Sequence, residues 1–203
     1  MARLDEKFFL QDTVLAAQEL LGAYLVRNDK GEIMVCRITE TEAYVGAVDK
    51  ACHAYGGRRT KRTETLYAKP GTSYVYLIYG MYCCLNFVTG PENVASAVLV
   101  RGGRPVYGAD AIATRRFGVC EKEMSAYQRK NFLNGPGKLC KGLSIDKSLN
   151  ALPLDNEALY LAWDVPELGL KRLAKQPFLT GKRIGIDYAE EAIDFPWRFW
   201  LEA

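Results

Sequence analysis

Two glutamates and a tyrosine recur at alternate positions of the segment ITETEAY, at Glu40, Glu42 and Tyr44. In a strand these side chains share one face, and the two carboxylates begin about 6.6 Å apart along the backbone, at about 3.3 Å per residue. Such a pair could serve as the two carboxylates of a carbohydrate glycosidase. Alternatively, one carboxylate activates water at a glycosidic carbon while aromatic rings hold the leaving base, which the neighbouring Tyr44 favours. In a third interpretation both glutamates are solvated on an exposed face, as most charged residues are.

A cluster of tyrosines forms the second chemical feature, in the segment TSYVYLIYGMYCCLNF at residues 72–87. Four of the 12 tyrosines of the chain fall within a few positions there, namely Tyr74, Tyr76, Tyr79 and Tyr82. Strand alternation predicts that Tyr74 and Tyr76 share one face while Tyr79 belongs to the other. Aromatic residues are common on half-buried strands, so packing alone could explain the cluster.

The pair Gly80-Met81 interrupts this run and predicts a two-residue hairpin turn of type II′. The turn would place Tyr79 and Tyr82 opposite each other at the tip, with Met81 projecting from it. Asn86 would lie on the returning strand, on the same side as Tyr82. An uncharged tip of this kind, if it protrudes into water, suits a wedge, because aromatic or apolar side chains inserted between stacked bases unstack and kink a duplex.

Basic residues gather in the segment GGRRTKR, which holds Arg58, Arg59, Lys61 and Arg62. Such a loop is most often solvated surface, but four cations beside an aromatic hairpin would also suit contacts with phosphates. The only histidine, His53, precedes this loop, and a lone histidine is more often a hydrogen-bonded structural residue than a catalytic one. The segment GPGKLCKG lacks the spacing of a nucleotide-binding P-loop, so we expect no such loop.

The elements that must position these groups follow from hydrophobic spacing. Residues 12–22 predict a helix capped by Asp12 and ended by Gly22. Residues 23–44 predict a hairpin around the turn NDKG. Further helices are predicted at residues 105–118 and 121–135, and further strands at residues 158–163, 182–187 and 198–201. Because strands and helices do not alternate strictly, the pattern favours an α+β fold over a wound parallel fold.

Composition sets the class of protein. A chain of 203 residues with 49% hydrophobic content predicts one domain over residues 1–203. A net charge of +3, from 27 basic and 24 acidic residues, excludes a strong polyelectrolyte but allows a local basic patch. Six cysteines without a C-x-x-C pair, and a single histidine, do not supply the ligand spacing of a zinc site. We therefore expect reduced thiols, no metal and no cofactor.

The first residues, MARLDEKFFLQD, lack the basic and apolar regions of a secretion signal, and we expect a cytoplasmic protein. The uncharged stretch around the tyrosine cluster is interrupted by Gly80 and Asn86. A membrane helix needs roughly 20 mostly apolar residues, so we expect no membrane association.

The segments ETEAY, GGRRT, KPGTSYVYLIYGMYCCLN, VLVR and NGPGKLC, with His53 between the first two, follow one another in an order that resembles the alkyladenine (3-methyladenine) DNA glycosylase family, in its short bacterial form. The resemblance runs from about Phe8 to Phe199. It implies a single α+β domain with a mixed, mainly antiparallel curved sheet, flanking helices and a protruding β-hairpin with its tip near Tyr79 and Tyr82. It also implies a monofunctional enzyme that flips alkylated, deaminated or etheno purines out of duplex DNA and hydrolyses the N-glycosidic bond, leaving an abasic site.

The resemblance assigns catalytic roles to three positions. Glu42 matches the general base that activates water, and Arg101 matches the arginine that helps to position that water. Ile184 matches a main-chain carbonyl that contacts the same water. Glu40 matches no catalytic position, which counts against the paired-carboxylate glycosidase.

The resemblance also assigns residues to the base pocket and to the DNA surface. In the pocket, Tyr44 and Tyr76 match rings that sandwich the flipped base, His53 matches its third wall, and Asn86 matches the residue that crowds the exocyclic amine of guanine. Tyr79 matches the side chain that intercalates into the duplex, with Met81 beside it. We expect the four cations of the basic loop to contact phosphates.

The expected partner is double-stranded DNA that contains damaged purines, bound by a monomer in the cytoplasm and associated with the nucleoid. Two alternatives remain at this point. One is a protein that binds lesions or nucleic acid without releasing a base, and the other is a carbohydrate glycosidase that uses Glu40 and Glu42.

Overall fold

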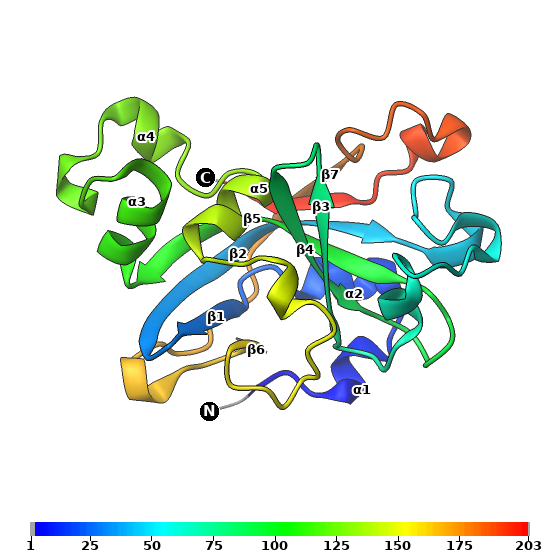
Figure 1. The fold of residues 1–203 in the computed structure, drawn as a ribbon, viewed down its shortest axis with the longest axis horizontal. Helices are drawn as coiled ribbons and strands as arrows, with labels where there is room; N and C mark the ends of the chain where they lie inside the picture. Colours follow the sequence, from blue (N-terminus) through cyan, green and yellow to red (C-terminus); the bar gives the residue numbers. More distant parts are fainter. Residues whose placement is uncertain (1–2, 203) are drawn as a thin grey trace.

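One sheet with the strand order β3-β4-β5-β2-β1-β6 forms the centre of the molecule, with β8 paired to β2 and β7 paired to β8. The computed structural model describes residues 3–202 (Figure 1). The strands are β1 (Tyr24–Asp29), β2 (Glu32–Tyr44), β3 (Ser73–Ile78), β4 (Tyr82–Val88), β5 (Ala97–Tyr107), β6 (Leu159–Ala162), β7 (Phe178–Gly181) and β8 (Arg198–Leu201). All of their pairings within residues 3–202 are antiparallel. The predicted α+β fold is confirmed, and its sheet is antiparallel throughout this range rather than mixed.

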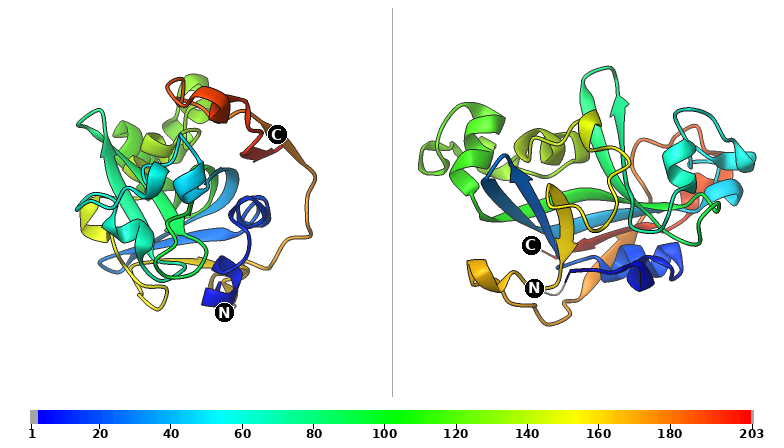
Figure 2. Two further views of the ribbon diagram at one scale, coloured as in Figure 1. Left: turned by 90° about the vertical axis from the view of Figure 1, so that its right-hand side faces the viewer. Right: turned by 60° about the horizontal axis from the view of Figure 1, so that its bottom comes forward.

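Helices cover the sheet on two sides. Residues 3–202 contain α1 (Glu6–Phe9), α2 (Thr13–Glu19), α3 (Ala109–Phe117), α4 (Ala126–Lys130) and α5 (Pro136–Gly142). The right-hand view of Figure 2 shows α1 and α2 on one side of the sheet, while the β3–β4 hairpin projects from the other. The protruding hairpin that the resemblance implied is therefore present.

The long strand β2 carries the acidic segment, and its side chains make contacts on both faces of the sheet. Asp12 caps α2 by accepting the amide N–H of Leu15 at 3.0 Å, as predicted. The Thr41 hydroxyl of β2 donates to the carbonyl of Ala17 in that helix at 2.7 Å. Because side chains alternate along a strand, Glu42 points to the opposite face, where the hairpin stands.

The pairing of β2 with β5 is irregular beside the two glutamates. The register shifts between Ile38 and Glu40 and again between Glu40 and Thr41. Such irregularities bend a strand and re-aim its side chains, and they are frequent near active sites. Regular pairing resumes at Thr41, opposite Val100, and continues with Glu42 opposite Leu99.

Two predicted helices are shorter in the structure than in the sequence analysis. Residues 105–107 continue β5, and α3 begins at Ala109 after Gly108, whose φ of +69° is in the left-handed region that favours glycine. Residues 121–135 hold a 3₁₀ turn at Glu121–Glu123 and the five residues of α4. The hydrophobic spacing predicted both helices too long. The end of a strand and a short capped turn can show the same apolar spacing as a helix.

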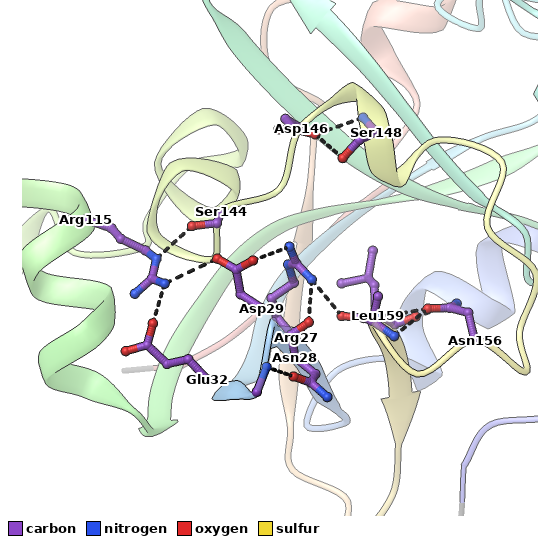
Figure 3. A network of polar contacts seen from close by, with 12 residues as sticks. Arg27, Asn28, Asp29, Glu32, Arg115, Ser144, Asp146, Ser148, Asn156 and Leu159 are labelled. Atoms are coloured by element: carbon purple, nitrogen blue, oxygen red, sulfur yellow. Dashed lines mark hydrogen bonds and ion pairs between the residues drawn. The ribbon is translucent and has the colours of Figure 1, made fainter.

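Polar contacts fasten α3 to the end of the β1–β2 hairpin (Figure 3). The Arg115 guanidinium donates to the carboxylates of Asp29, at 3.3 Å, and of Glu32. It also donates to the hydroxyl of Ser144, which follows α5, at 2.7 Å. Asp29 in turn accepts from Arg27 of β1 at 3.1 Å. These contacts join the β1–β2 hairpin, α3 and the segment after α5.

Apolar residues fill the space between the sheet and its helices. Fully buried side chains in this core include Phe9, Leu20, Met34, Phe87 and Phe199. A smaller buried cluster lies under the β3–β4 hairpin. Among the helices of residues 3–202, none combines the length and the apolar character required to cross a bilayer.

Candidate active site

A cavity of about 760 Å³ opens beside the β3–β4 hairpin. Strands β2 to β5, residues 51–66, the start of α5 and residues 184–188 contribute to its wall. Nine residues with predicted roles line it together: Glu42, Tyr44, His53, Arg62, Tyr76, Tyr79, Asn86, Arg101 and Ile184. The fold therefore gathers into one site residues that lie as far as 142 positions apart in the chain.

Glu42 is the most enclosed charged group of this cavity, with an exposed fraction of 0%. Its Oε1 accepts the main-chain N–H of Ile184 at 3.0 Å, and its Oε2 accepts the hydroxyl of Tyr44 at 2.8 Å. The Nε of Arg101 lies 3.6 Å from Oε1. Because each carboxylate oxygen can accept two hydrogen bonds, the group retains the capacity to accept a proton from water.

Burial raises the pKa of Glu42 above its ordinary value. The positive charge of Arg101, the Ile184 amide and the Tyr44 hydroxyl lower this pKa in part, and the negative charge of Glu40 adds to the rise. A carboxylate whose pKa is raised while donors still stabilise its charge has the properties of a general base that works near neutral pH.

Arg101 contacts both glutamates of the segment ETE. Its Nε donates to Oε1 of Glu40 at 3.0 Å, and that same oxygen accepts from Nη1 of Arg198 at 2.9 Å. The carboxylate of Glu40 is therefore occupied by two arginines and does not line the cavity. Since Glu42 alone of the two glutamates reaches the cavity, the arrangement disfavours the paired-carboxylate glycosidase.

Aromatic rings of three different segments form the wall around the cavity. The ring of His53 meets the ring of Tyr76 edge-on, with centroids 4.6 Å apart, and Tyr76 lies 5.3 Å from Tyr74. The ring of Tyr44 has the guanidinium of Arg183 at 4.8 Å from its centroid. The three predicted pocket aromatics, Tyr44, His53 and Tyr76, are thus brought together in one place.

The two ring nitrogens of His53 are both engaged. Its Nδ1 lies 3.0 Å from the hydroxyl of Tyr74, and its Nε2 lies 3.3 Å from Nη2 of Arg62. Because a guanidinium only donates, Nε2 must accept, which places the proton on Nδ1. Burial and the charge of Arg62 lower the pKa of His53 to about 4. A histidine that is neutral at physiological pH suits a pocket wall better than a general acid.

The alternation predicted for the hairpin strands is confirmed. Tyr74 and Tyr76 line the cavity while Val75 packs into the main core on the other face. On the returning strand, Cys84 and Asn86 line the same cavity. The buried Asn86 side chain donates from Nδ2 to the carbonyl of Tyr74 at 3.0 Å, which fixes its carboxamide in the wall.

The turn of the hairpin differs from the prediction. Ile78, not Tyr79, pairs with Tyr82, and the turn residues in the left-handed region are Tyr79 (φ +52°) and Gly80 (φ +71°). The loop therefore has three residues, 79–81, instead of the two predicted. The Met81 amide donates to the Ile78 carbonyl at 3.2 Å, and positive φ at both central positions of this turn is the type I′ pattern rather than the predicted type II′. Tyr79 and Met81 stand at the tip with exposed fractions of 79% and 69%.

The basic loop divides into residues that lie near the cavity and residues that lie away from it. The guanidinium of Arg62 lies 5.5 Å from the centroid of Tyr76 and lines the cavity. Arg59 pairs with Glu64 at 2.7 Å and lies over the ring of Tyr67. Arg58 and Lys61 are exposed on the loop. A role in phosphate contacts stays a prediction for all four cations.

The predicted strand at residues 182–187 is wrong, since β7 ends at Gly181 and the chain that follows is irregular. The side chain of Arg183 is directed inward and pairs with Asp49, with contacts at 2.5 and 2.8 Å. This anchor presents the next residue, Ile184, to Glu42. The contact made is from the main-chain amide, whereas the role predicted for Ile184 was that of a main-chain carbonyl beside the water.

Several cavity residues escaped the sequence analysis. Tyr188 lines the rim near Ile184, and Arg116 and Lys138 approach from α3 and α5. The Nζ of Lys138 donates to the side chains of Asn131 and Asn134, at 2.8 Å each. Only the basic character of the segments that hold Arg116 and Lys138 was visible in the sequence, and nothing there marked Tyr188. Within residues 3–202, no group of His, Cys, Asp or Glu side chains is arranged to hold a metal ion.

Known proteins match the sequence of this chain over nearly its whole length. The family model described as methylpurine-DNA glycosylase matches residues 7–203. A protein of Clostridium perfringens (strain 13 / Type A) is 51% identical over 203 residues, which cover 98% of this chain and 96% of the relative. A protein of Desulfitobacterium hafniense (strain Y51) is 46% identical over 202 residues, covering 100% and 96%. Both carry the name "Putative 3-methyladenine DNA glycosylase".

A relative in Clostridioides difficile (strain 630) has the same name and is 46% identical over 202 residues, which cover 98% of this chain and all of the relative. Matches of this extent include the acidic strand, the hairpin and the segment that holds Ile184. The chain belongs to the methylpurine-DNA glycosylase family.

Proposed function

We propose that this protein is a DNA repair glycosylase that receives a damaged purine nucleotide from duplex DNA in its cavity and hydrolyses the N-glycosidic bond. The observation that supports this proposal best is Glu42, a buried carboxylate that accepts two hydrogen bonds and pairs with Arg101 in the wall of a cavity lined with aromatic rings. The family to which the chain belongs supplies the expectation that the substrate is DNA.

In the proposed reaction, Glu42 takes a proton from a water molecule as the oxygen of that water bonds to C1′ of the nucleotide. The bond between C1′ and the base nitrogen breaks, and its electron pair leaves with the purine. The negative charge of Glu42 also stabilises the positive charge that develops on the sugar. The products are a free base and an abasic site.

The aromatic wall explains how bases with different damage could share one pocket. Stacking of a base on an aromatic side chain contributes about 1–3 kcal/mol and tolerates any base, because every base has a π face. Tyr44 and Tyr76 would sandwich the base, with His53 as the third wall. A purine alkylated at N3 or N7 carries positive charge, which strengthens its attraction to ring faces.

Entry of the base requires that its nucleotide leave the duplex. The cost of unstacking is a few kcal/mol and is smallest for damaged or poorly paired bases. The exposed Tyr79 would fill the space that the nucleotide vacates, with Met81 beside it. Asn86, fixed by its bond to the Tyr74 carbonyl, would crowd the exocyclic amine of an undamaged guanine.

We propose a monofunctional enzyme. A glycosylase that also cleaves the strand needs an amine that attacks the sugar. Lys138 lines the cavity, but its Nζ is held by two asparagine side chains, and we assign it with Arg116 to phosphate contacts. Base release without strand cleavage is the expected product pattern.

The decisive test compares Glu42→Gln with the wild type on duplexes that each carry one defined lesion: an N3- or N7-alkylated purine, hypoxanthine, or ethenoadenine. Glutamine preserves the shape but cannot take the proton, so base release should fall by about 10²- to 10⁴-fold, the contribution of a general base. Binding of the lesion duplex, measured by gel shift, should persist. Glu167→Gln, an exposed substitution outside the cavity, serves as the control.

Base release at the wild-type rate by Glu42→Gln would contradict the assignment of Glu42. If the wild-type protein binds every lesion duplex and releases no base, it is a binding protein and not an enzyme. Hydrolysis of sugar substrates in place of DNA would point to the carbohydrate glycosidase.

A further inference from the structure

Glu40 contacts the same side chain, Arg101, that pairs with Glu42. Its Oε1 accepts from Nε of Arg101 at 3.0 Å, and that same nitrogen lies 3.6 Å from Oε1 of Glu42. One guanidinium nitrogen is therefore shared by two carboxylates, and the nearer of them is the one outside the cavity. The position of Arg101 relative to Glu42 thus depends on Glu40.

The carboxylate of Glu40 is enclosed and cannot easily turn away. Its side chain is 18% exposed, and that of Arg101 is 14% exposed. Glu40 pairs with Gly102 across the irregular part of the β2–β5 ladder. A Cβ atom at Gly102 would lie only 3.2 Å from Cβ and 3.3 Å from Oε2 of Glu40, so the absence of a side chain there leaves room for the glutamate.

A second arginine connects Glu40 to the segment that holds Ile184. Nη1 of Arg198, on β8, donates to Oε1 of Glu40 at 2.9 Å, and its Nε donates to the carbonyl of Lys182 at 2.9 Å. Two residues later, the amide of Ile184 donates to Glu42 at 3.0 Å. Glu40 therefore takes part in both contacts that hold Oε1 of Glu42, through Arg101 on one side and through Arg198 on the other.

We propose that Glu40 is a positioning residue for the glycosylase reaction, which holds Arg101 against Glu42 and offsets the positive charge that Arg101 brings to the base. The proposal rests on the proposed role of Glu42. It also accounts for both glutamates of the segment ETE: one receives the proton, and the other sets the environment in which it does so.

The charges around Glu42 determine the sign of the expected effect. Charged, polar or titratable groups face it from every neighbouring element: Glu40 and Tyr44 of β2, Arg101 of β5, Tyr76 of β3, Cys84 of β4, Arg198 of β8, which lies opposite Glu42 in the ladder, and the Ile184 amide. Arg101 lowers the pKa of Glu42 and Glu40 raises it. Loss of the Glu40 charge removes one of the two causes that raise this pKa, burial being the other, so the pKa of Glu42 should fall.

The test is the pH dependence of single-turnover base release by Glu40→Gln. The glutamine oxygen still accepts from both arginines, so the geometry is kept while the charge is lost. We expect the acid limb of the rate profile to move to lower pH by about one unit, as a charge a few ångströms away produces, and the plateau rate to fall because a weaker base removes the proton less readily.

Glu40→Asp provides the second variant. It keeps the charge but shortens the reach to Arg101, so its acid limb should stay near that of the wild type while its rate falls. Glu167→Gln should change neither quantity. Circular dichroism and the thermal midpoint establish that each variant is folded. An acid limb in Glu40→Gln at the wild-type pH, whatever the rate, overturns the proposal, because a purely structural role would lower the rate without moving the limb.

Failure of this inference can be told apart from failure of the proposed function. If Glu42→Gln is inactive while Glu40→Gln has the wild-type profile, only the role of Glu40 is refuted. If Glu42→Gln retains activity, Glu42 is not the base, and the inference about Glu40 falls with it.

Discussion

At the scale of single residues, the site depends on how a carboxylate can be buried and still remain a base. Burial raises the pKa of Glu42 and so favours its protonated form, because a charge is poorly stabilised away from water. The Tyr44 hydroxyl at 2.8 Å and the Ile184 amide at 3.0 Å restore part of that stabilisation. Tyr44 thus has two proposed tasks, since its ring stacks on the base while its hydroxyl tunes the carboxylate.

The substitution Tyr44→Phe separates these two tasks. It keeps the ring but removes a hydrogen bond that lowers the pKa of Glu42, so this pKa should rise further. Because the base acts in its ionised form, the acid limb of base release should move to higher pH, the opposite direction from Glu40→Gln. Tyr127→Phe, in an exposed tyrosine of α4, is the matched control. A limb that stays in place or moves to lower pH would contradict the prediction.

At the scale of elements, the β3–β4 hairpin combines pocket walls and a protruding tip in one two-stranded element. The first turn of α5 packs against it, since a Cβ atom at Gly137 would lie 3.0 Å from Cβ of Tyr82. The tip itself is strained, because a tyrosine seldom adopts the φ of +52° seen at Tyr79. Strain of this kind persists where the surrounding structure enforces it and is frequent at functional sites.

The proposed wedge predicts that Tyr79→Ala weakens the binding of lesion-containing duplex. The loss should be at least about fivefold in Kd, the lower end of what stacking between an aromatic side chain and a base contributes. Fluorescence anisotropy with the Glu42→Gln background prevents turnover during the measurement. Tyr127→Ala removes a tyrosine of similar exposure, 73% against 79%, from α4. Equal losses in the two variants would argue against a specific role for the tip.

At the scale of the whole molecule, a buried ion pair joins the segment after β2 to the segment after β7. Both side chains of Asp49 and Arg183 are 0% exposed, with contacts at 2.5 and 2.8 Å. Arg183 also donates to the carbonyls of Ala43 and Ala192, at 2.8 and 3.3 Å. This pair fixes the residue next to Ile184, which lines the cavity.

Removal of one partner of this pair should destabilise the fold strongly. Asp49→Asn leaves the Arg183 charge buried without its counterion, which costs about 3–5 kcal/mol in comparable buried pairs. The free energy of unfolding from urea titration measures the loss. Asp194→Asn breaks the exposed pair of Lys182 and Asp194, which should matter by about 0–1 kcal/mol. Similar losses in the two variants would show that the buried pair contributes no more to the free energy of unfolding than the exposed pair.

Much of the site could be predicted from the sequence because its signals are local. Side chains alternate between the two faces of any extended backbone. Strand alternation alone therefore predicts that Glu42 shares a face with Tyr44, and Tyr74 with Tyr76. The order of the segments that carry the family resemblance then predicted the role of each site residue. The turn was mispredicted because glycine is compatible with loops of two or of three residues, and the longer loop at residues 79–81 changes the pairing by one residue.

What the tertiary structure alone decided are the contacts between segments distant in the chain. The meeting of Ile184 with Glu42, the burial of Arg183 on Asp49 and the bridge from Arg198 through Glu40 to Arg101 join positions more than 50 residues apart. Such contacts depend on how the sheet curls and on which irregular segment closes over it. Local periodicity contains no information on either. The sequence by itself determined which side chains could do the chemistry, Glu42 among them, and the fold decided which distant groups surround that carboxylate.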